Sequence, residues 1–569
     1  MVTDSVYSLP RARIAHTHGI AIGGAAAVGA ALLGIALVIG LATASRYGLT
    51  VDEFNTDAYG PKALAWYTSL GRDRSHFETV EQFLWYYGPW HQILTAIAQS
   101  LLPADPIAVR HAMTFLAGIA GLAALIPIAR LSVGAWAGPV AIGLCLMTGY
   151  LYGSLFFTPI DVPFLAAMCG ATCGILLMAR SETPSWPATI AAGVLIGVAM
   201  STRPGGIITH AYLLGAMALT ALEAVLRKGR AATAPLARIA AVTLAAMVIS
   251  WITATALWPW LQIGNPFRQF ATAYVHFLAI PMEFTFPSWG QEIATNALPW
   301  YYVPTQFFAR LPEGFLLLLA AGAVLAGVTA IRFARAAFAR WRKWGAAGLR
   351  APGLVLARAR GTLVVIVAAT VPVAFIMVTQ PPQYDGVRHV LFVIPMLAVL
   401  AGGALLQLIP PLRRRPVLGF VVAAATAAHI GTTLWTLTQL HPLEYAAINS
   451  IAGGNTKGSD QRFELDYWGA AASEAIRLLE RRLDQDRSGT FASSPPRVLV
   501  CMTHRQWLAA KLFHRNWTVE LEGDKADFII DTERMPCGKE FAGVALLDEV
   551  KRLNISFARV YGNNRGRPD

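Results

Sequence analysis

Residues 20–44 read IAIGGAAAVGAALLGIALVIGLATA, an apolar run of about 25 residues without a charged side chain. A helix of this length crosses about 30 Å of hydrocarbon. Ala42-Thr43-Ala44 resembles a signal-peptidase site, and Arg11 and Arg13 precede the run. The apolar part of a signal peptide, however, is only about 7 to 15 residues long. We therefore predict that this run is a retained membrane helix.

The composition of the whole chain points the same way. The 569 residues are 55% apolar and only 14% charged, whereas soluble domains are about 25% charged. This excludes a string of soluble domains. The net charge of +13 comes mostly from Lys and Arg in short loops between apolar runs, which is typical of cytoplasmic loops rather than of nucleic-acid binding.

Ten further apolar runs follow the first, so the sequence predicts an all-α polytopic membrane protein with about eleven transmembrane helices. The predicted spans are 20–44, 107–129, 132–153, 162–180, 187–202, 205–226, 236–258, 311–331, 361–379, 389–410 and 416–439. Residues 332–360 carry eight basic and no acidic residues, with Phe338, Trp341 and Trp344 among them. This predicts a helix lying in the inner interface on anionic lipid.

An odd number of spans places the tail outside. We predict a transmembrane catalytic module over residues 1–440, with outer loops 46–106, 154–161, 259–310 and 380–389, followed by a small extracytoplasmic α/β domain over residues 441–569. Within that domain the pattern predicts a helix at 471–483 and a strand at 498–501. Cys501 and Cys537 both lie outside, where a disulfide can form, but their spacing leaves the pairing open.

Carboxylates stand in two outer loops. Asp52 and Glu53 follow the first helix, where adjacent acids suit either proton abstraction from a hydroxyl or metal binding. Asp161 lies between two prolines at the start of a helix, where it either caps the helix or serves the reaction.

Arginines stand on the same side, where positive charge is not expected. Arg203 lies in a tight hairpin and pairs with Asp161 or holds a phosphate. Arg388 stands beside His389; it either snorkels at a helix end or binds an anionic headgroup. Aromatic residues in the outer loops are typical of an interfacial belt, or of sugar binding by stacking. The candidates for sugar or acceptor binding are Tyr59, Trp258, Trp260 and Tyr384.

Carboxylates, arginines and aromatic rings on one face are the groups needed to move a sugar from a lipid phosphate. The sequence has no glycine-rich phosphate loop between a strand and a helix, which a nucleotide-sugar site would use. A donor already embedded in the membrane does not need such a loop.

Four short motifs carry a family resemblance over about residues 20–440. They are Asp52-Glu53, TPIDVPF at 158–164, TRPGG at 202–206, and RHVLF at 388–392 with Pro395. Their order resembles the GT-C membrane glycosyltransferases, in the branch that contains protein O-mannosyltransferases and lipid A aminoarabinose transferases (glycosyltransferase families 39 and 83). Residues 441–469 are similar to a segment after the last helix in a bacterial subset; there Asp466, Tyr467 and Trp468 are expected to pack the tail onto the bundle or to shape the acceptor site.

The resemblance implies a polyprenyl-phosphate sugar donor, inversion by direct displacement, and a glycan, lipid or protein acceptor of the cell envelope, such as lipopolysaccharide. In this scheme Asp52 is the catalytic base, Asp161 is the second acid, and Arg203 and Arg388, with His389, hold the donor phosphate. No cofactor is expected, although Asp52, Glu53 and Asp161 leave a divalent metal such as Mg or Mn as an option. A composition rich in Ala, Arg and Gly suggests a bacterium, and hence an inner-membrane protein with its site facing the periplasm.

Three other functions remain open from the sequence, and one of them is a membrane scaffold whose tail binds partners. A flippase for a lipid-linked sugar would use the same arginines for phosphate, but it would more often place ionisable groups midway along its helices. A ligase or polymerase that uses lipid diphosphates would need the outward Arg and His but not Asp52 and Glu53.

Overall fold

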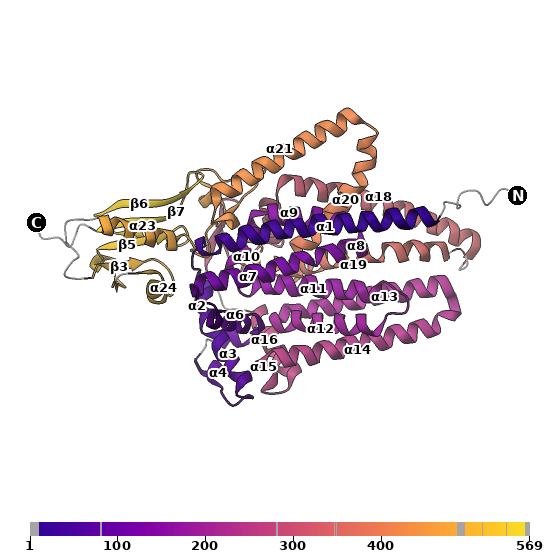
Figure 1. Ribbon diagram of the computed structural model, residues 1–569, viewed down its shortest axis with the longest axis horizontal. Coiled ribbons are helices and arrows are strands. Elements are labelled where there is room, and N and C mark those ends of the chain that lie inside the picture. Colours follow the sequence, from indigo (N-terminus) through magenta and orange to yellow (C-terminus); the bar gives the residue numbers. More distant parts are fainter. Residues whose placement is uncertain are drawn as a thin grey trace, which may run out of the picture.

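Long apolar helices packed side by side make up most of the molecule, and a small mixed sheet lies at one end of them (Figure 1). The computed structural model describes residues 11–79, 82–279, 283–345, 348, 350–485, 495–514, 516–541 and 543–563. The long helices are α1 (Arg11–Thr43), α7 (Pro106–Ala123), α8 (Leu125–Ser132), α9 (Ala137–Met147), α10 (Gly149–Phe157), α11 (Asp161–Ala179), α12 (Trp186–Thr202), α13 (Ile208–Lys228), α14 (Thr233–Leu257), α18 (Glu313–Trp344), α19 (Arg350–Thr379), α20 (Val393–Arg413) and α21 (Pro416–Leu440).

All eleven predicted spans form helices. Within the described residues, nine helical stretches are long and apolar enough to cross a membrane. Helix α12 is also apolar, but its 17 residues make it shorter than each of these nine stretches. The predicted span over 132–153 is bent: α9 and α10 meet at an angle of 75°, and together they are long and apolar enough to count as a tenth span.

Close contact with the chain after the last helix accounts for the direction of α10. This helix lies against the short turn η6 (Glu444–Ala446). A Cβ on Gly153 would come within 2.4 Å of the backbone nitrogen of Tyr445. Only glycine permits this approach, so α10 lies beneath the start of the tail instead of continuing α9.

The basic segment 332–360 also differs from its prediction. Residues 332–344 continue α18, and residues 350–360 begin α19, so these residues extend two spanning helices rather than forming a separate interfacial helix.

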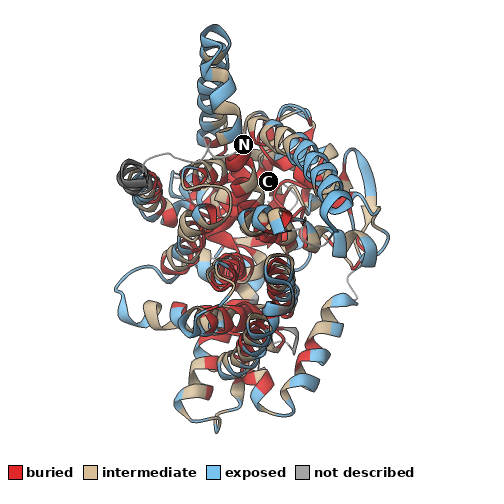
Figure 2. Ribbon diagram, turned by 90° about the vertical axis from the view of Figure 1, so that its right-hand side faces the viewer, coloured by how far each residue is buried: buried red, intermediate tan, exposed pale blue. Residues whose placement is uncertain are grey.

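The outer surface of the bundle is apolar. Viewed along the bundle, the buried residues gather at its centre and exposed faces lie around them (Figure 2). Large side chains such as Leu317 (69% exposed) and Val378 (83%) point outward from helices. Apolar surface on this scale needs a lipid environment, and the chain is a multi-pass membrane protein.

The loops at the sheet end of the bundle are folded into short elements. The loop after α1 contains α2 (Val51–Asp57), α3 (Tyr59–Thr68), α4 (Ser75–Thr79), α5 (Gln82–Trp85) and α6 (Trp90–Leu101). The outer loop 259–310 contains α15 (Pro259–Gln262), α16 (Pro266–Leu278), the hairpin β1 (Thr285–Ser288) and β2 (Gln291–Ala294), and α17 (Tyr302–Arg310).

The tail forms the predicted α/β domain, which we call the C-terminal domain. Its sheet has the strand order β4-β3-β5-β7-β6. The strands are β3 (Arg497–Val500), β4 (Thr518–Val519), β5 (Phe528–Thr532), β6 (Val544–Arg552) and β7 (Ile555–Asn563), and the helices are α22 (Ser459–Arg462), α23 (Ala472–Gln485) and α24 (Arg505–Leu512). The predicted helix and strand correspond to α23 and β3.

Two turns of this domain face the bundle and are joined to each other. Strands β3 and β5 are parallel, and the turns after their carboxyl ends line a cavity together with residues of the bundle. A disulfide between Cys501 and Cys537, with a Cα–Cα distance of 6.1 Å, joins these two turns.

Candidate active site

Asp52 is presented by the first turn of α2. Thr50 is the N-cap of this helix, and its backbone nitrogen donates to Glu53 Oε2 at 2.9 Å in a capping box. A capping box fixes the first helical turn. The carboxylate of Asp52, with 31% of its side chain exposed, therefore lines the cavity beneath the C-terminal domain.

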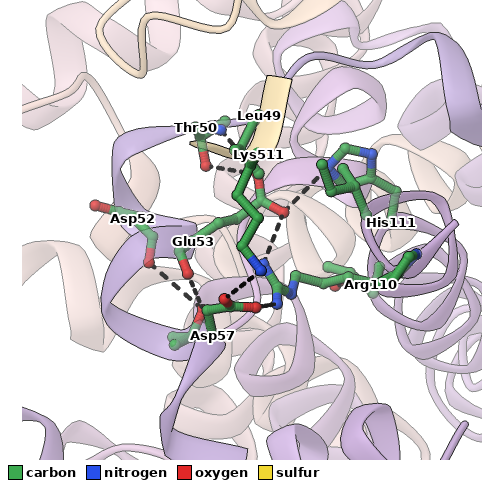
Figure 3. A network of polar contacts seen from close by, with 12 residues as sticks. Leu49, Thr50, Asp52, Glu53, Asp57, Arg110, His111 and Lys511 are labelled. Carbon is green, nitrogen blue, oxygen red and sulfur yellow. Dashed lines mark hydrogen bonds and ion pairs between the residues drawn. The ribbon is translucent and has the colours of Figure 1, made fainter. Parts of the chain in front are cut away.

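Glu53 points away from this cavity. Its Oε1 lies 3.1 Å from His111 Nε2 and 3.8 Å from a guanidinium nitrogen of Arg110, and Figure 3 shows this network on the side of α2 away from the Asp52 side chain. Burial acts to raise the pKa of Glu53, but His111 and Arg110 outweigh it, so the pKa lies below its usual value. Glu53 therefore pairs with His111 and Arg110 and does not line the cavity, where a catalytic or metal-binding acid was expected from the sequence.

Replacing Glu53 with glutamine should therefore destabilise the protein. We expect a loss of about 3 kcal/mol, because a buried ion pair loses one partner, and it should be seen as a lower midpoint in thermal unfolding. Glu78→Gln, an exposed position in the same loop, is the matched control and should leave the midpoint unchanged. Loss of activity without any loss of stability would contradict this assignment.

Arg388 joins three carboxylates. One terminal nitrogen lies 2.7 Å from Asp52 Oδ2, the other lies 2.6 Å from Asp385 Oδ2, and Nε lies 3.3 Å from Asp161 Oδ2. Arg388 lies in η5 (Arg388–Val390), between α19 and α20. These carboxylates raise its pKa although burial opposes them, so the guanidinium stays charged.

Arg203 completes a charged cluster, which consists of Asp52, Asp161, Arg203, Asp385 and Arg388. It makes an ion pair with Asp161, and its guanidinium lies 5.8 Å from the ring centroid of Tyr87. Asp161 begins α11 and is itself buried. The ion pair is one of the two roles expected for Arg203, and it places Asp161 between two arginines.

The cavity beside this cluster has a volume of about 1080 Å³. Its walls come from the loop after α1, from the β1–β2 hairpin and from the C-terminal domain. The charged and aromatic residues that line it include Asp52, Tyr87, Asp161, Phe277, Phe284, Phe286, Glu292, Tyr384, Asp385, Arg388, Glu464, Tyr467, Trp468, His504, Glu533 and Arg534. Among the described residues, Glu464 Oε2 and Trp468 Nε1 are buried polar atoms without a hydrogen-bond partner. The lining of the cavity therefore combines charged side chains with aromatic rings.

A second, apolar groove of about 220 Å³ adjoins the cavity. Tyr384 and Phe277 line both spaces. The groove is also lined by Phe164, Arg203, Pro204, Ile207, Ile208, Tyr274, Leu278, Pro372, Phe375, Ile376, His389, Val390 and Phe392. His389 Nδ1 lies 3.0 Å from Gln383 Oε1, and burial lowers the pKa of His389 well below its usual value, so His389 faces the groove as a neutral ring.

Three of the four aromatic candidates do not line either space. Tyr59 is buried and donates to the backbone oxygen of Tyr87 at 2.6 Å. Trp258 donates to the backbone of Trp85, and Trp260 donates to that of Gln269. These three hold the loops together, and only Tyr384 lies where the sequence prediction needs it.

The residues that sequence reasoning missed come mainly from the tail. Glu464, Glu533 and Arg534 line the cavity, but nothing in the local sequence distinguishes them from solvated charges. Asp385 stands three residues before Arg388, and that helical spacing was the available signal.

The cluster does not fit a divalent cation. Within the described part of the chain no group of three or more His, Cys, Asp and Glu side chains is arranged to hold a metal. Asp52 and Asp161 both face the guanidinium of Arg388, and Glu53 is turned away. We derive no step through a metal.

Buried acids in the C-terminal domain predict a pH-dependent stability. Burial raises the pKa of Glu464 to about 7 and that of Glu533 to about 8. Both folded-state pKa values lie above the usual value of about 4.3, so the folded state holds extra protons and becomes less stable as pH rises from about 5 to about 8. Thermal unfolding in detergent should show a falling midpoint over this range. Glu533→Gln should reduce the fall and unfold at a higher temperature than wild type at pH 8.5; an identical pH profile would contradict the assignment.

No protein-family model matches this sequence, and no curated protein matches it by sequence. Several solved structures resemble its fold, among them those of ArnT and AglB. The crystal structure of ArnT from Cupriavidus metallidurans bound to undecaprenyl phosphate aligns with 95% of this chain and 99% of its own, at 16% identity and a TM-score of 0.45. AglB, an archaeal oligosaccharyltransferase from Archaeoglobus fulgidus in complex with an inhibitory peptide and a dolichol-phosphate, aligns with 95% of this chain and 75% of its own, at 12% identity and a TM-score of 0.44.

ArnT and AglB are GT-C membrane glycosyltransferases, the group that the sequence motifs resemble. By its own helices this chain is a multi-pass membrane protein with a C-terminal mixed-sheet domain, and its fold is similar to those of ArnT and AglB.

Proposed function

We propose that this protein transfers a sugar from a polyprenyl-monophosphate carrier to an acceptor hydroxyl on a glycan, lipid or protein. The observation that carries the proposal is the charged cluster where the polar cavity meets the apolar groove. Asp161 is paired with Arg203, which lines the groove, and lies 3.3 Å from Arg388, which lines the cavity beside Asp52. A lipid-linked sugar needs this combination of an apolar path, cations for phosphate and a polar chamber.

The proposed reaction is a single displacement. An acceptor hydroxyl attacks the anomeric carbon and its proton passes to a carboxylate oxygen of Asp52. The bond between the anomeric carbon and the phosphate oxygen breaks, and the electron pair leaves with the phosphate. Arg203 and Arg388 stabilise the leaving phosphate, which needs no acid because it departs as an anion. Attack opposite to the leaving group inverts the anomeric centre.

We further propose that the site faces the periplasm of a bacterial inner membrane. Figure 1 shows that α13 and α20 end away from the C-terminal domain, and the last turns of these helices contain Lys228 and Arg413. Cytoplasmic loops carry this excess of positive charge. A cysteine-accessibility assay on intact cells, with one cysteine at an exposed position of the C-terminal domain, would test the orientation.

The donor class can be tested with the purified protein in detergent. Short-chain polyprenyl-monophosphate sugars, the corresponding diphosphates and a lipid and glycan extract as acceptor would be supplied to the wild type. Transfer from a monophosphate donor supports the proposal. Transfer from diphosphates alone would favour a ligase or polymerase, and movement of the lipid across liposomes without transfer would favour a flippase.

A further inference from the structure

The C-terminal domain contributes an arginine to the charged cluster. Arg534 follows β5, and one of its terminal nitrogens lies 3.0 Å from Asp385 Oδ1 and 3.7 Å from Glu464 Oε1. The same nitrogen donates to the backbone oxygen of Tyr467. Its guanidinium lies 5.0 Å from the ring centroid of Phe284, so Arg534 reaches from the domain into the cavity.

Asp385 is the link between this arginine and the bundle. Its Oδ1 faces Arg534, and its Oδ2 lies 2.6 Å from Arg388. Asp385 is 1% exposed, and its backbone oxygen accepts a hydrogen bond of 2.5 Å from Tyr150. A carboxylate buried this deeply needs both cations, because removing one partner leaves a charge only partly compensated.

The direction of Arg388 depends on this link. A guanidinium is a planar fork whose nitrogens cannot turn independently. When one terminal nitrogen is fixed on Asp385, the other is directed toward Asp52 and Nε toward Asp161. Arg534, Asp385, Arg388 and Asp52 therefore form a continuous series of ion pairs.

The covalent framework keeps Arg534 in place. The Cys501–Cys537 disulfide anchors the turn that carries it to the end of β3. The backbone nitrogen of Met535 also donates to the backbone oxygen of Thr532 at 3.1 Å. Arg534 is thus held by its own domain, while Asp385 and Arg388 belong to the bundle.

We propose that Arg534 is a positioning residue for transfer: the C-terminal domain, through Arg534 and Asp385, sets the orientation in which Arg388 meets Asp52 and the donor phosphate. This inference rests on the proposed function. It assigns the C-terminal domain a part in assembling the reaction centre of the membrane bundle.

The test is a double-mutant cycle in the transfer assay with the full-length protein. Arg534→Gln and Asp385→Asn should each lower kcat/KM about 10- to 100-fold. The double variant should be no worse than the Asp385→Asn variant, because both changes break the same link. Arg534→Lys should recover much of the activity, since a single nitrogen makes the polar contacts of Arg534. Arg482→Gln is the matched control: this arginine of the same domain pairs with Asp548 at 3.2 Å and is half-exposed, and its loss should leave kcat/KM unchanged.

The outcomes separate this inference from the proposed function. An active wild type with an equally active Arg534→Gln variant would overturn the inference alone. Multiplied losses in the double variant would also overturn it, because they would mean that the two residues act independently. A wild type without transfer from any monophosphate donor would overturn the proposed function and this inference with it. Thermal unfolding of each variant detects simple misfolding, and Arg534→Lys keeps the test usable if Arg534→Gln does not fold.

Discussion

Replacing Asp52 with asparagine is expected to lower the rate of sugar transfer by about 100- to 10,000-fold, the usual contribution of a general base. Asparagine keeps the size of the side chain but cannot accept the hydroxyl proton. The carboxylate of Asp52 lies at the cavity wall, 2.7 Å from Arg388. Its loss should reduce kcat strongly and donor affinity only slightly, because the proposed role of Asp52 belongs to the transition state.

The matched control is Asp105→Asn. Asp105 ends the same loop and caps α7 by accepting from the backbone nitrogens of Ile107 and Ala108. Asparagine caps helices as well as aspartate does, so this variant should keep both its stability and its activity. Full activity of the Asp52→Asn variant beside an active wild type would move the base to another residue, and Asp161 would be the next candidate.

Replacing Arg388 with glutamine is expected to have the second large effect. Three carboxylates would lose a partner at once, of which Asp161 and Asp385 are buried. Transfer should fall by about 100- to 1,000-fold, because the leaving phosphate loses a cation, and the free energy of unfolding should fall by about 3 to 5 kcal/mol. Steady-state kinetics and thermal unfolding of the same preparation measure the two effects.

Arg388→Lys separates charge from geometry. Lysine keeps the positive charge, but it lacks the planar fork whose three separate nitrogens meet Asp52, Asp385 and Asp161. We expect it to recover stability better than activity. Arg268→Gln, at an exposed position on α16, is the control and should match wild type. An Arg388→Lys variant with wild-type kcat/KM would show that the forked geometry is not needed.

The predictions for Asp52 and Glu53 concern opposite sides of one helix, α2. Asp52 and Glu53 are neighbours in the sequence, yet one lines the cavity and the other pairs with His111. The Glu53→Gln and Asp52→Asn variants should therefore differ in kind. The first should lose stability and the second should lose turnover.

The membrane helices could be predicted from the sequence alone. Hydropathy is a local property, and a run of about 20 apolar residues has no stable alternative to a spanning helix in a bilayer. Asp52, Asp161, Arg203 and Arg388 could also be identified as candidates from the sequence. Each stands at the edge of an apolar run, where a charge is costly unless it is used or paired. The structure brings these four together in one cluster.

The directions of the side chains and the contacts between distant segments depend on tertiary packing and could not be predicted from the sequence. Successive residues of a helix point about 100° apart. The packing of α2 therefore decides that Asp52 lines the cavity and that Glu53 points toward His111. Packing against the tail likewise turned α10 by 75° from α9. Asp385 and Arg534 are 149 positions apart, and no local pattern records a contact over that separation. The sequence thus specified the helices and the charged residues of the site, while the docking of the C-terminal domain on the bundle decided which of those charges act together.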